Sequence, residues 1–262
     1  MIVDAHTHIF SDPAANPYPR GGSVEDLLRD LDAVGVDAAL VIPLPGCATN
    51  EVVWEACACH TGRLFPAYTP DFSADGGALA AMQRFVGGSL PHAIKIHPRL
   101  QGVRPDDEAV RELLVWAGGK GVPVIFDVFP FGDGVDDVGL WPLAYHRLAR
   151  EHRDVTIVLA HAGGFRVMDA FMVAKANPNV VLEVSLTLRY FPGSSVEQDL
   201  AFVCRRLPAG RVIYGSDFPN IGIEESLATA KAIGGLSEQQ RTAFFGDTAQ
   251  QIYRLNLTAT RL

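Results

Sequence analysis

The sequence predicts an α/β protein, a (β/α)8 TIM barrel that is slightly distorted and carries an additional C-terminal helix. Two observations predict it: eight short apolar runs alternate with longer stretches of helical periodicity, and most of the runs are apolar at consecutive positions. Strands that are apolar on both faces are typical of a parallel sheet covered by helices. Eight repeats of strand and helix favour closure into a barrel. The runs interpreted as strands are Ile2–Ile9, Ala38–Pro43, Leu64–Tyr68, Ala93–His97, Pro123–Val128, Thr156–His161, Val180–Ser185 and Val212–Ser216.

Start signals mark helices between these runs. Ser23 is an N-cap candidate that precedes two acidic residues, which favour the positive end of a helix dipole. Pro105 stands at the expected first position of another helix and is followed by three carboxylates. The segment Ser237–Leu255 is expected to form the additional C-terminal helix, capped by Ser237.

Two further features bear on domain organisation. No Gly-x-Gly-x-x-Gly turn follows the first run, which makes an open doubly wound sheet the less favoured alternative. No low-complexity linker divides the chain, so we expect one domain over residues 1–262. The Pro- and Gly-rich stretch Ser11–Gly22 is expected to be a long loop after the first strand, where such loops often form part of an active site.

The composition is that of an ordinary globular protein, with 48% hydrophobic and 20% charged residues. A formal charge of −8 without any basic run argues against nucleic acid or an anionic membrane as a partner. The sequence has no apolar stretch near the roughly 20 residues that span a bilayer and no signal-like N-terminus. We therefore expect a cytoplasmic protein that acts on a small molecule, as a homodimer if it oligomerises. Reduced packing roles, mostly buried, are expected for Cys47, Cys57, Cys59 and Cys204.

Polar residues gather where the predicted strands end, which is where barrel enzymes build their active sites. His6 and His8 are two apart in the first strand, so their side chains point to the same side and form half of a divalent metal site. A lone histidine of this kind is more often structural, but polar residues at four strand ends together favour a functional site. The other three ends read Lys95-Ile96-His97, His161-Ala162-Gly163-Gly164 and Gly215-Ser216-Asp217-Phe218-Pro219.

His-x-His, His-Ala-Gly-Gly and Gly-Ser-Asp-Phe-Pro, in this order along the chain, resemble the amidohydrolase superfamily. The likeness is closest to the amidohydrolase-2 branch that contains aminocarboxymuconate semialdehyde decarboxylase. By this resemblance His6 and His8 bind a divalent metal, and Asp217 is both a ligand and the proton acceptor of the attacking water. His161 then polarises the substrate or shuttles a proton. Because a metal lowers the pKa of its bound water from 15.7 toward about 7, a nearby carboxylate suffices as the base.

The fifth predicted strand departs from this family pattern, in which a metal-binding histidine ends the strand. Asp127 stands in that place. One expectation is that Asp127 adds an oxygen ligand, which gives a site for one Zn²⁺ that also accepts Mn²⁺. The alternative is a site that binds metal weakly or not at all, since some lactone-hydrolysing relatives are understood to work without a metal. His97 is a lower-ranked candidate for the missing ligand.

Cationic residues near the same strand ends are candidates for substrate binding. Lys95 is expected to be an uncarboxylated cation that pairs with Asp127 or holds a substrate carboxylate. A carboxylated, metal-bridging Lys95 is less favoured, because the binuclear relatives also need the fifth-strand histidine. Either Arg99 or Arg189 is expected to bind a substrate carboxylate in bidentate fashion. The substrate-binding candidates are Lys95, His97, Arg99, Arg189 and Tyr190.

The leading functional hypothesis is a metal-dependent hydrolase of an amide, ester or lactone of a small organic acid. A non-oxidative decarboxylase of an aromatic or unsaturated acid fits the same residues, and so does a metal-independent lactonase. A barrel that binds a ligand without catalysis is favoured only by Asp127, and His6, His8, His161 and Asp217 argue against it.

Overall fold

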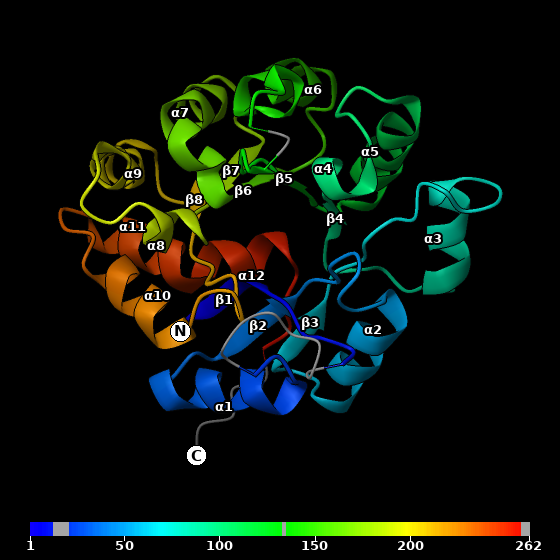
Figure 1. The fold of residues 1–262 in the computed structure, drawn as a ribbon, viewed down its shortest axis with the longest axis horizontal. Coiled ribbons are helices and arrows are strands. Elements are labelled where there is room, and N and C mark those ends of the chain that lie inside the picture. Colours follow the sequence, from blue (N-terminus) through cyan, green and yellow to red (C-terminus); the bar gives the residue numbers. More distant parts are fainter. Residues whose placement is uncertain (13–20, 133–134, 258–262) are drawn as a thin grey trace.

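The eight apolar runs form eight parallel strands in the computed structural model, which describes residues 1–12, 21–132 and 135–257 (Figure 1). They make a three-stranded sheet in the order β1-β2-β3 and a five-stranded sheet in the order β4-β5-β6-β7-β8. The strands are β1 (Val3–Thr7), β2 (Ala38–Val41), β3 (Leu64–Pro66), β4 (Ile94–Ile96), β5 (Val124–Asp127), β6 (Ile157–Ala160), β7 (Val180–Glu183) and β8 (Val212–Ile213).

Single parallel bridges join the two sheets into a barrel. One bridge pairs Tyr68 with Ile94, between β3 and β4, and the other pairs Thr7 with Phe218, between β1 and the segment after β8. At the second seam the His8 amide donates to the Phe218 carbonyl at 2.8 Å. The two thin seams are the distortion of an otherwise regular (β/α)8 barrel.

Helices surround the strands and fill the links between them (Figure 1). Two short helices, α4 (Pro98–Gln101) and α8 (Thr187–Tyr190), directly follow β4 and the β7 segment at the mouth of the barrel. The longer ones are α1 (Val24–Val34), α2 (Asn50–Cys59), α3 (Ala78–Val86), α5 (Glu108–Lys120), α6 (Tyr145–Glu151), α7 (Val167–Ala176), α9 (Ser195–Arg206) and α10 (Ile223–Lys231). None of the helices in these described ranges is long and apolar enough to cross a membrane.

The apolar side chains form two separate cores. One lies between the strands and the helices, and the other fills the inside of the barrel with small and branched residues such as Ala5, Leu40 and Val158. The inner core also takes in Tyr253 and Leu255 from the C-terminal run. Because alternate strand residues point inward, the barrel is a packed core, and only its mouth is left for chemistry.

Three sequence expectations need correction. The strands are shorter than predicted, so His8, His97 and His161 lie just beyond strand ends, and β8 ends at Ile213, before Asp217. The α5 helix begins at Glu108 and not at Pro105, because the Asp107 carboxylate accepts from the Arg104 amide and closes a turn first.

The C-terminal segment is the third correction. Ser237 caps α11 (Glu238–Thr242) as expected, but a π-helical turn η6 (Ala243–Asp247) follows, and α12 (Thr248–Ile252) ends before Leu255. Three consecutive residues of this turn, Phe244 to Gly246, are buried. Phe244 and Phe245 pack in the core between strands and helices, and Gly246 lies against the backbone of Met1.

Two smaller expectations concern the cysteines and the loop after the first strand. All four cysteines are free, but only Cys57 and Cys204 are buried, while Cys59 is exposed. Most of the predicted loop Ser11–Gly22 falls on residues 13–20, which lie outside the described residues.

Candidate active site

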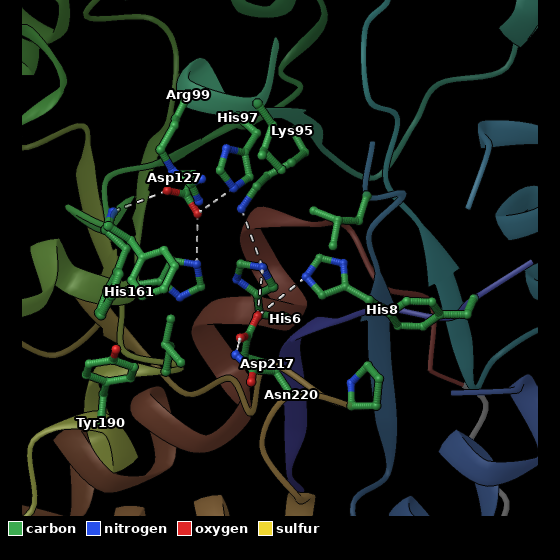
Figure 2. Close-up of a pocket in the computed structure, with 17 residues that line it drawn as sticks. His6, His8, Lys95, His97, Arg99, Asp127, His161, Tyr190, Asp217 and Asn220 are labelled. Atoms are coloured by element: carbon green, nitrogen blue, oxygen red, sulfur yellow. Dashed lines mark hydrogen bonds and ion pairs between the residues drawn. The ribbon is translucent and has the colours of Figure 1, made fainter. Parts of the chain in front are cut away.

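All the predicted site residues except Arg189 meet in one pocket of about 320 Å³ at the mouth of the barrel (Figure 2). Its floor is made of side chains from the carboxyl ends of β1, β4, β5 and β6 and from the segment after β8. Apolar residues that include Phe10, Phe129 and Phe131 form its rim. The site residues that line it are His6, His8, Lys95, His97, Arg99, Asp127, His161, Tyr190, Asp217 and Asn220.

His6 and His8 each turn the same ring nitrogen toward the pocket. The His6 Nδ1 atom lies 2.7 Å from Glu183 Oε2, and the His8 Nδ1 atom lies 2.8 Å from the Ile42 carbonyl oxygen. Both partners only accept hydrogen bonds, so both Nδ1 atoms carry the proton. Burial and the neighbouring Lys95 ammonium hold the pKa of His6 well below its usual range. A neutral His6 therefore presents a bare Nε2 lone pair to the pocket, as a metal ligand does.

Asp217 brings a carboxylate to these two nitrogens. Its Oδ1 atom lies 3.4 Å from His8 Nε2 and 3.8 Å from His6 Nε2, while its Oδ2 atom accepts from Asn220 Nδ2 at 3.0 Å. Burial alone would raise the pKa of Asp217, but the hydrogen bond to His8 and the nearby imidazoles hold it below its ordinary value. The Asp217 oxygen and the two Nε2 atoms therefore face one another across a space that a proton or a cation would occupy.

The residues fit a divalent ion in donor type and spacing. Two atoms that bind one tetrahedral Zn²⁺ at 2.0–2.2 Å are separated by about 3.4 Å, close to the separations seen here. Ligand atoms of His6, His161 and Asp217 also lie within 4.8 Å of one another. A buried set of this kind is therefore a possible metal site. The His8 Nε2 atom is a further donor beside the same Asp217 oxygen.

Asp127 contacts His97 and His161 in the pocket, and its role as a metal ligand stays a prediction. Its Oδ2 atom is 3.0 Å from His161 Nε2 and 3.2 Å from His97 Nε2, and its Oδ1 atom accepts from the Phe129 amide (Figure 2). Burial would raise the pKa of Asp127, but His97, His161 and Lys95 hold it well below its ordinary value. Asp127 thus serves as the common acceptor of two imidazoles.

His161 is held at both ring nitrogens. Its Nδ1 atom lies 2.9 Å from Ser185 Oγ, and its Nε2 atom faces Asp127. Burial would lower the pKa of His161, but the hydrogen bond and the charge of Asp127 raise it above the ordinary value. The backbone of His161 is left-handed with φ 61°. Such a conformation costs about 1–3 kcal/mol, and residues held in it cluster at functional sites.

Lys95 does not form the ion pair with Asp127 that was one of its predicted roles, and its role in holding a substrate carboxylate stays a prediction. The side chain is fully buried, and its Nζ atom lies 3.4 Å from His6 Nε2. Asp127 influences it only at longer range: among the described residues no carboxylate oxygen lies within 4.0 Å of Nζ. Burial lowers the pKa of Lys95, partly offset by Asp127, Glu183 and Asp217.

The two candidate arginines separate clearly. Arg99 lines the pocket beside the Phe131 ring, 5.7 Å from its centroid, and makes no ion pair with a carboxylate of the described residues. Arg189 lies outside the pocket, is exposed, and reaches Thr229 on α10. The expectation that Arg189 binds substrate is therefore not supported by its position, although its neighbour Tyr190 does line the pocket.

Three residues of the site were missed by the sequence reasoning. Glu183 ends β7 and contacts His6, Ser185 follows the strand and contacts His161, and Asn220 contacts Asp217. Glu183 and Ser185 are two apart at the end of the seventh strand, which is the same spacing that singled out His6 and His8. That signal was present in the sequence, and Asn220 had none.

Comparison with known proteins agrees with this geometry. The family model described as Amidohydrolase matches residues 3–255, and the chain belongs to this family. No curated protein sequence matches the chain.

Solved structures share the fold along almost the entire chain. An uncharacterised TIM-barrel protein from Bordetella bronchiseptica is 17% identical with a TM-score of 0.84, and the alignment covers 97% of this chain and 98% of that one. A probable 2-pyrone-4,6-dicarboxylic acid hydrolase from Acinetobacter baumannii, with citric acid bound, is 13% identical with a TM-score of 0.73 and coverages of 97% and 99%. The 5-carboxyvanillate decarboxylase from Sphingomonas paucimobilis is 13% identical with a TM-score of 0.72 and the same coverages. At these identities the likeness establishes the barrel fold.

Proposed function

We propose that this protein hydrolyses an ester, lactone or amide bond of a small organic acid. The observation that carries the proposal is the meeting of His6 Nε2, His8 Nε2 and Asp217 Oδ1 in one pocket, at 3.4 and 3.8 Å. These three residues would hold one divalent metal, with Zn²⁺ favoured by two imidazoles and Mn²⁺ as the alternative. A bound ion of this kind acidifies water and polarises a carbonyl group.

The chain's own residues divide the proton transfers of hydrolysis between them. Asp217 accepts the proton of the attacking water, since Asn220 orients it and its ionised form is favoured. His161 donates a proton to the leaving group, because Asp127 favours its protonated form. The two groups come from different strand ends and differ in charge, which suits one base and one acid.

Arg99 and Lys95 supply positive charge for a substrate carboxylate. Arg99 has no carboxylate partner among the described residues, and a guanidinium binds a carboxylate with two parallel hydrogen bonds. The citric acid bound to the Acinetobacter baumannii relative is consistent with a carboxylate ligand on this fold.

A decarboxylase is the second candidate. Protonated His161 at the wall of the pocket favours it, because loss of CO₂ leaves a carbanion that needs a proton. The Sphingomonas paucimobilis relative is a decarboxylase with the same fold. Both reactions use a bound carboxylated substrate, and they differ in the mass of the product.

Mass spectrometry of products from a panel of carboxylated lactones, esters, amides and aromatic acids tests this function. Hydrolysis adds the mass of water, and decarboxylation removes the mass of CO₂. The panel is run on protein as purified, after chelation, and after addition of Zn²⁺ or Mn²⁺. If every active substrate gives a product that has lost CO₂, the hydrolase assignment is overturned. Full activity after complete metal removal overturns the proposed dependence on a metal.

A further inference from the structure

Glu183 is a buried carboxylate that none of the proton transfers above uses. It ends β7, is 1% exposed, and receives hydrogen-bond donors from two sides of the barrel. His6 Nδ1 and Ser185 Oγ each lie 2.7 Å from its Oε2 atom, and the Ser185 amide donates to its Oε1 atom. Each of these three contacts uses a Glu183 oxygen as the hydrogen-bond acceptor.

The bond to His6 determines which nitrogen of that ring faces the pocket. Because Glu183 can only accept, the His6 proton is held on Nδ1, and Nε2 keeps its lone pair. Without this partner a neutral imidazole is free to carry its proton on either nitrogen. With the proton on Nε2, His6 would present a donor where Asp217 and Lys95 face it, and no lone pair for a cation.

The same carboxylate reaches His161 through Ser185. The Ser185 hydroxyl donates to Glu183, so its oxygen accepts from His161 Nδ1 at 2.9 Å. The two imidazoles are stacked with ring centroids 4.8 Å apart. One carboxylate therefore orders the proton positions of both rings.

The segment after β8 leaves space for this carboxylate. A Cβ atom at Gly215 would lie 2.5 Å from Glu183 Oε1 and 2.8 Å from His6 Cβ, so only glycine leaves room for both side chains. Gly215 belongs to the Gly-Ser-Asp-Phe-Pro segment that also carries Asp217. The geometry of β7 and the β8 segment thus fixes Glu183 against His6.

We propose that Glu183 is a positioning residue that holds His6 in the Nδ1–H tautomer and, through Ser185, orients His161. A histidine that donates its second nitrogen to a carboxylate is a more basic and better oriented ligand. The use of the His6 lone pair rests on the proposed function, but the tautomer itself does not.

The test reads the tautomer directly, by long-range ¹H–¹⁵N NMR of the histidine rings in the full-length protein without substrate. A His6→Gln variant identifies the His6 signals. In the wild-type protein, His6 is expected to show a protonated Nδ1 and a bare Nε2. A wild-type His6 with its proton on Nε2 overturns the proposal without any variant at Glu183.

The Glu183→Gln variant gives the sharpest contrast. The Ser185 amide must donate, so the glutamine oxygen stays opposite it and the NH₂ group faces His6. His6 is then expected to move its proton to Nε2, and the affinity for Zn²⁺, measured by chelator competition, is expected to fall about 10–100-fold. An unchanged tautomer and affinity in a folded Glu183→Gln variant overturn the proposal.

Ser185→Ala is the matched control. It removes the hydrogen bond of the Ser185 hydroxyl to Glu183 Oε2 but leaves the bond to His6, so the His6 tautomer and Zn²⁺ affinity are expected to remain near wild type. A His6 tautomer change of equal size in both variants would indicate a general structural role and would also overturn the proposal. If the protein binds no Zn²⁺, the metal part of the proposed function fails, and the NMR result still decides the role of Glu183.

Discussion

The four imidazoles of the pocket form two pairs that are held in opposite ways. His6 and His8 are anchored through Nδ1 to acceptors in the barrel wall, and Nε2 points into the pocket toward Asp217. His97 and His161 are anchored through Nε2 to Asp127. In this pocket the contacts of a histidine depend on which ring nitrogen its hydrogen-bonding partner holds, and not on the residue type alone.

The two aspartates at the centres of these pairs differ in how many of their oxygens are held by hydrogen-bonding partners. Asp127 is satisfied by two imidazoles and the Phe129 amide, so it is part of the pocket wall. Asp217 is fixed at one oxygen by Asn220 and keeps the other toward the His6 and His8 nitrogens. Its backbone is also left-handed, with φ 67°, as often occurs at functional positions. Asp217 thus keeps one oxygen toward the two imidazole nitrogens, where the proposed chemistry needs it.

The largest expected effect comes from replacing Asp217 with asparagine. An amide of the same shape removes both the anionic donor and the proton acceptor, so we expect kcat to fall by about 10²–10⁴. Circular dichroism and thermal melting should show a fold like that of the wild type. An Asp217→Asn variant with near wild-type turnover would contradict the assignment of the base.

Replacing one histidine in each pair tests directly whether the two pairs differ in metal binding. His8→Asn removes a proposed ligand and should lower Zn²⁺ affinity by more than the roughly 10–100-fold typical of an indirect partner. His97→Asn, at a side chain that contacts Asp127, should leave metal content unchanged. Metal analysis of both proteins after identical dialysis checks this, and equal losses would show that the two pairs share one metal site.

The histidine and aspartate positions could be predicted from sequence because they recur at strand ends, where a parallel barrel gathers side chains. His6, His8, His161 and Asp217 meet in the pocket for this reason. The second partners of these residues could not be predicted in the same way. Glu183 bonds to a residue 177 positions away, and nothing local in its strand shows that contact.

The position of Arg189 outside the pocket could not be predicted for a different reason. Arg189 and Tyr190 are neighbours on the short helix α8, and successive residues of a helix point in directions about 100° apart. Only Tyr190 faces the pocket, and the choice between them depends on how α8 is oriented, which the sequence does not state. Similarly, the place of Asp127 at the end of β5 was predicted, but its pairing with His97 was not.

The same two arginines provide a smaller test of substrate binding. Loss of a charged hydrogen bond costs about 1.5–3 kcal/mol, so Arg99→Ala should raise KM for a carboxylated substrate by roughly 10–100-fold. Arg189→Ala is the matched control and should leave KM near wild type, since this side chain lies outside the pocket. Steady-state kinetics on one substrate decide between them. Equal effects would place the carboxylate elsewhere.

The smallest expected effect concerns the pH dependence that Asp127 gives to the second pair. Asp127 raises the pKa of His161 against the effect of burial, so Asp127→Asn should lower that pKa. The protonated form of His161 would then be lost at lower pH, and the basic limb of the kcat profile should move toward acid. At neutral pH this corresponds to a loss of about tenfold.

The stability that the interaction between His161 and Asp127 contributes depends on pH in the same direction. It is present below about pH 6.5, the pKa of histidine in the unfolded chain, and it is lost as pH rises through the raised pKa of His161. Rate profiles and urea melts of both proteins at several pH values measure the two effects. A basic limb that stays in place would mean that a group other than His161 supplies the proton.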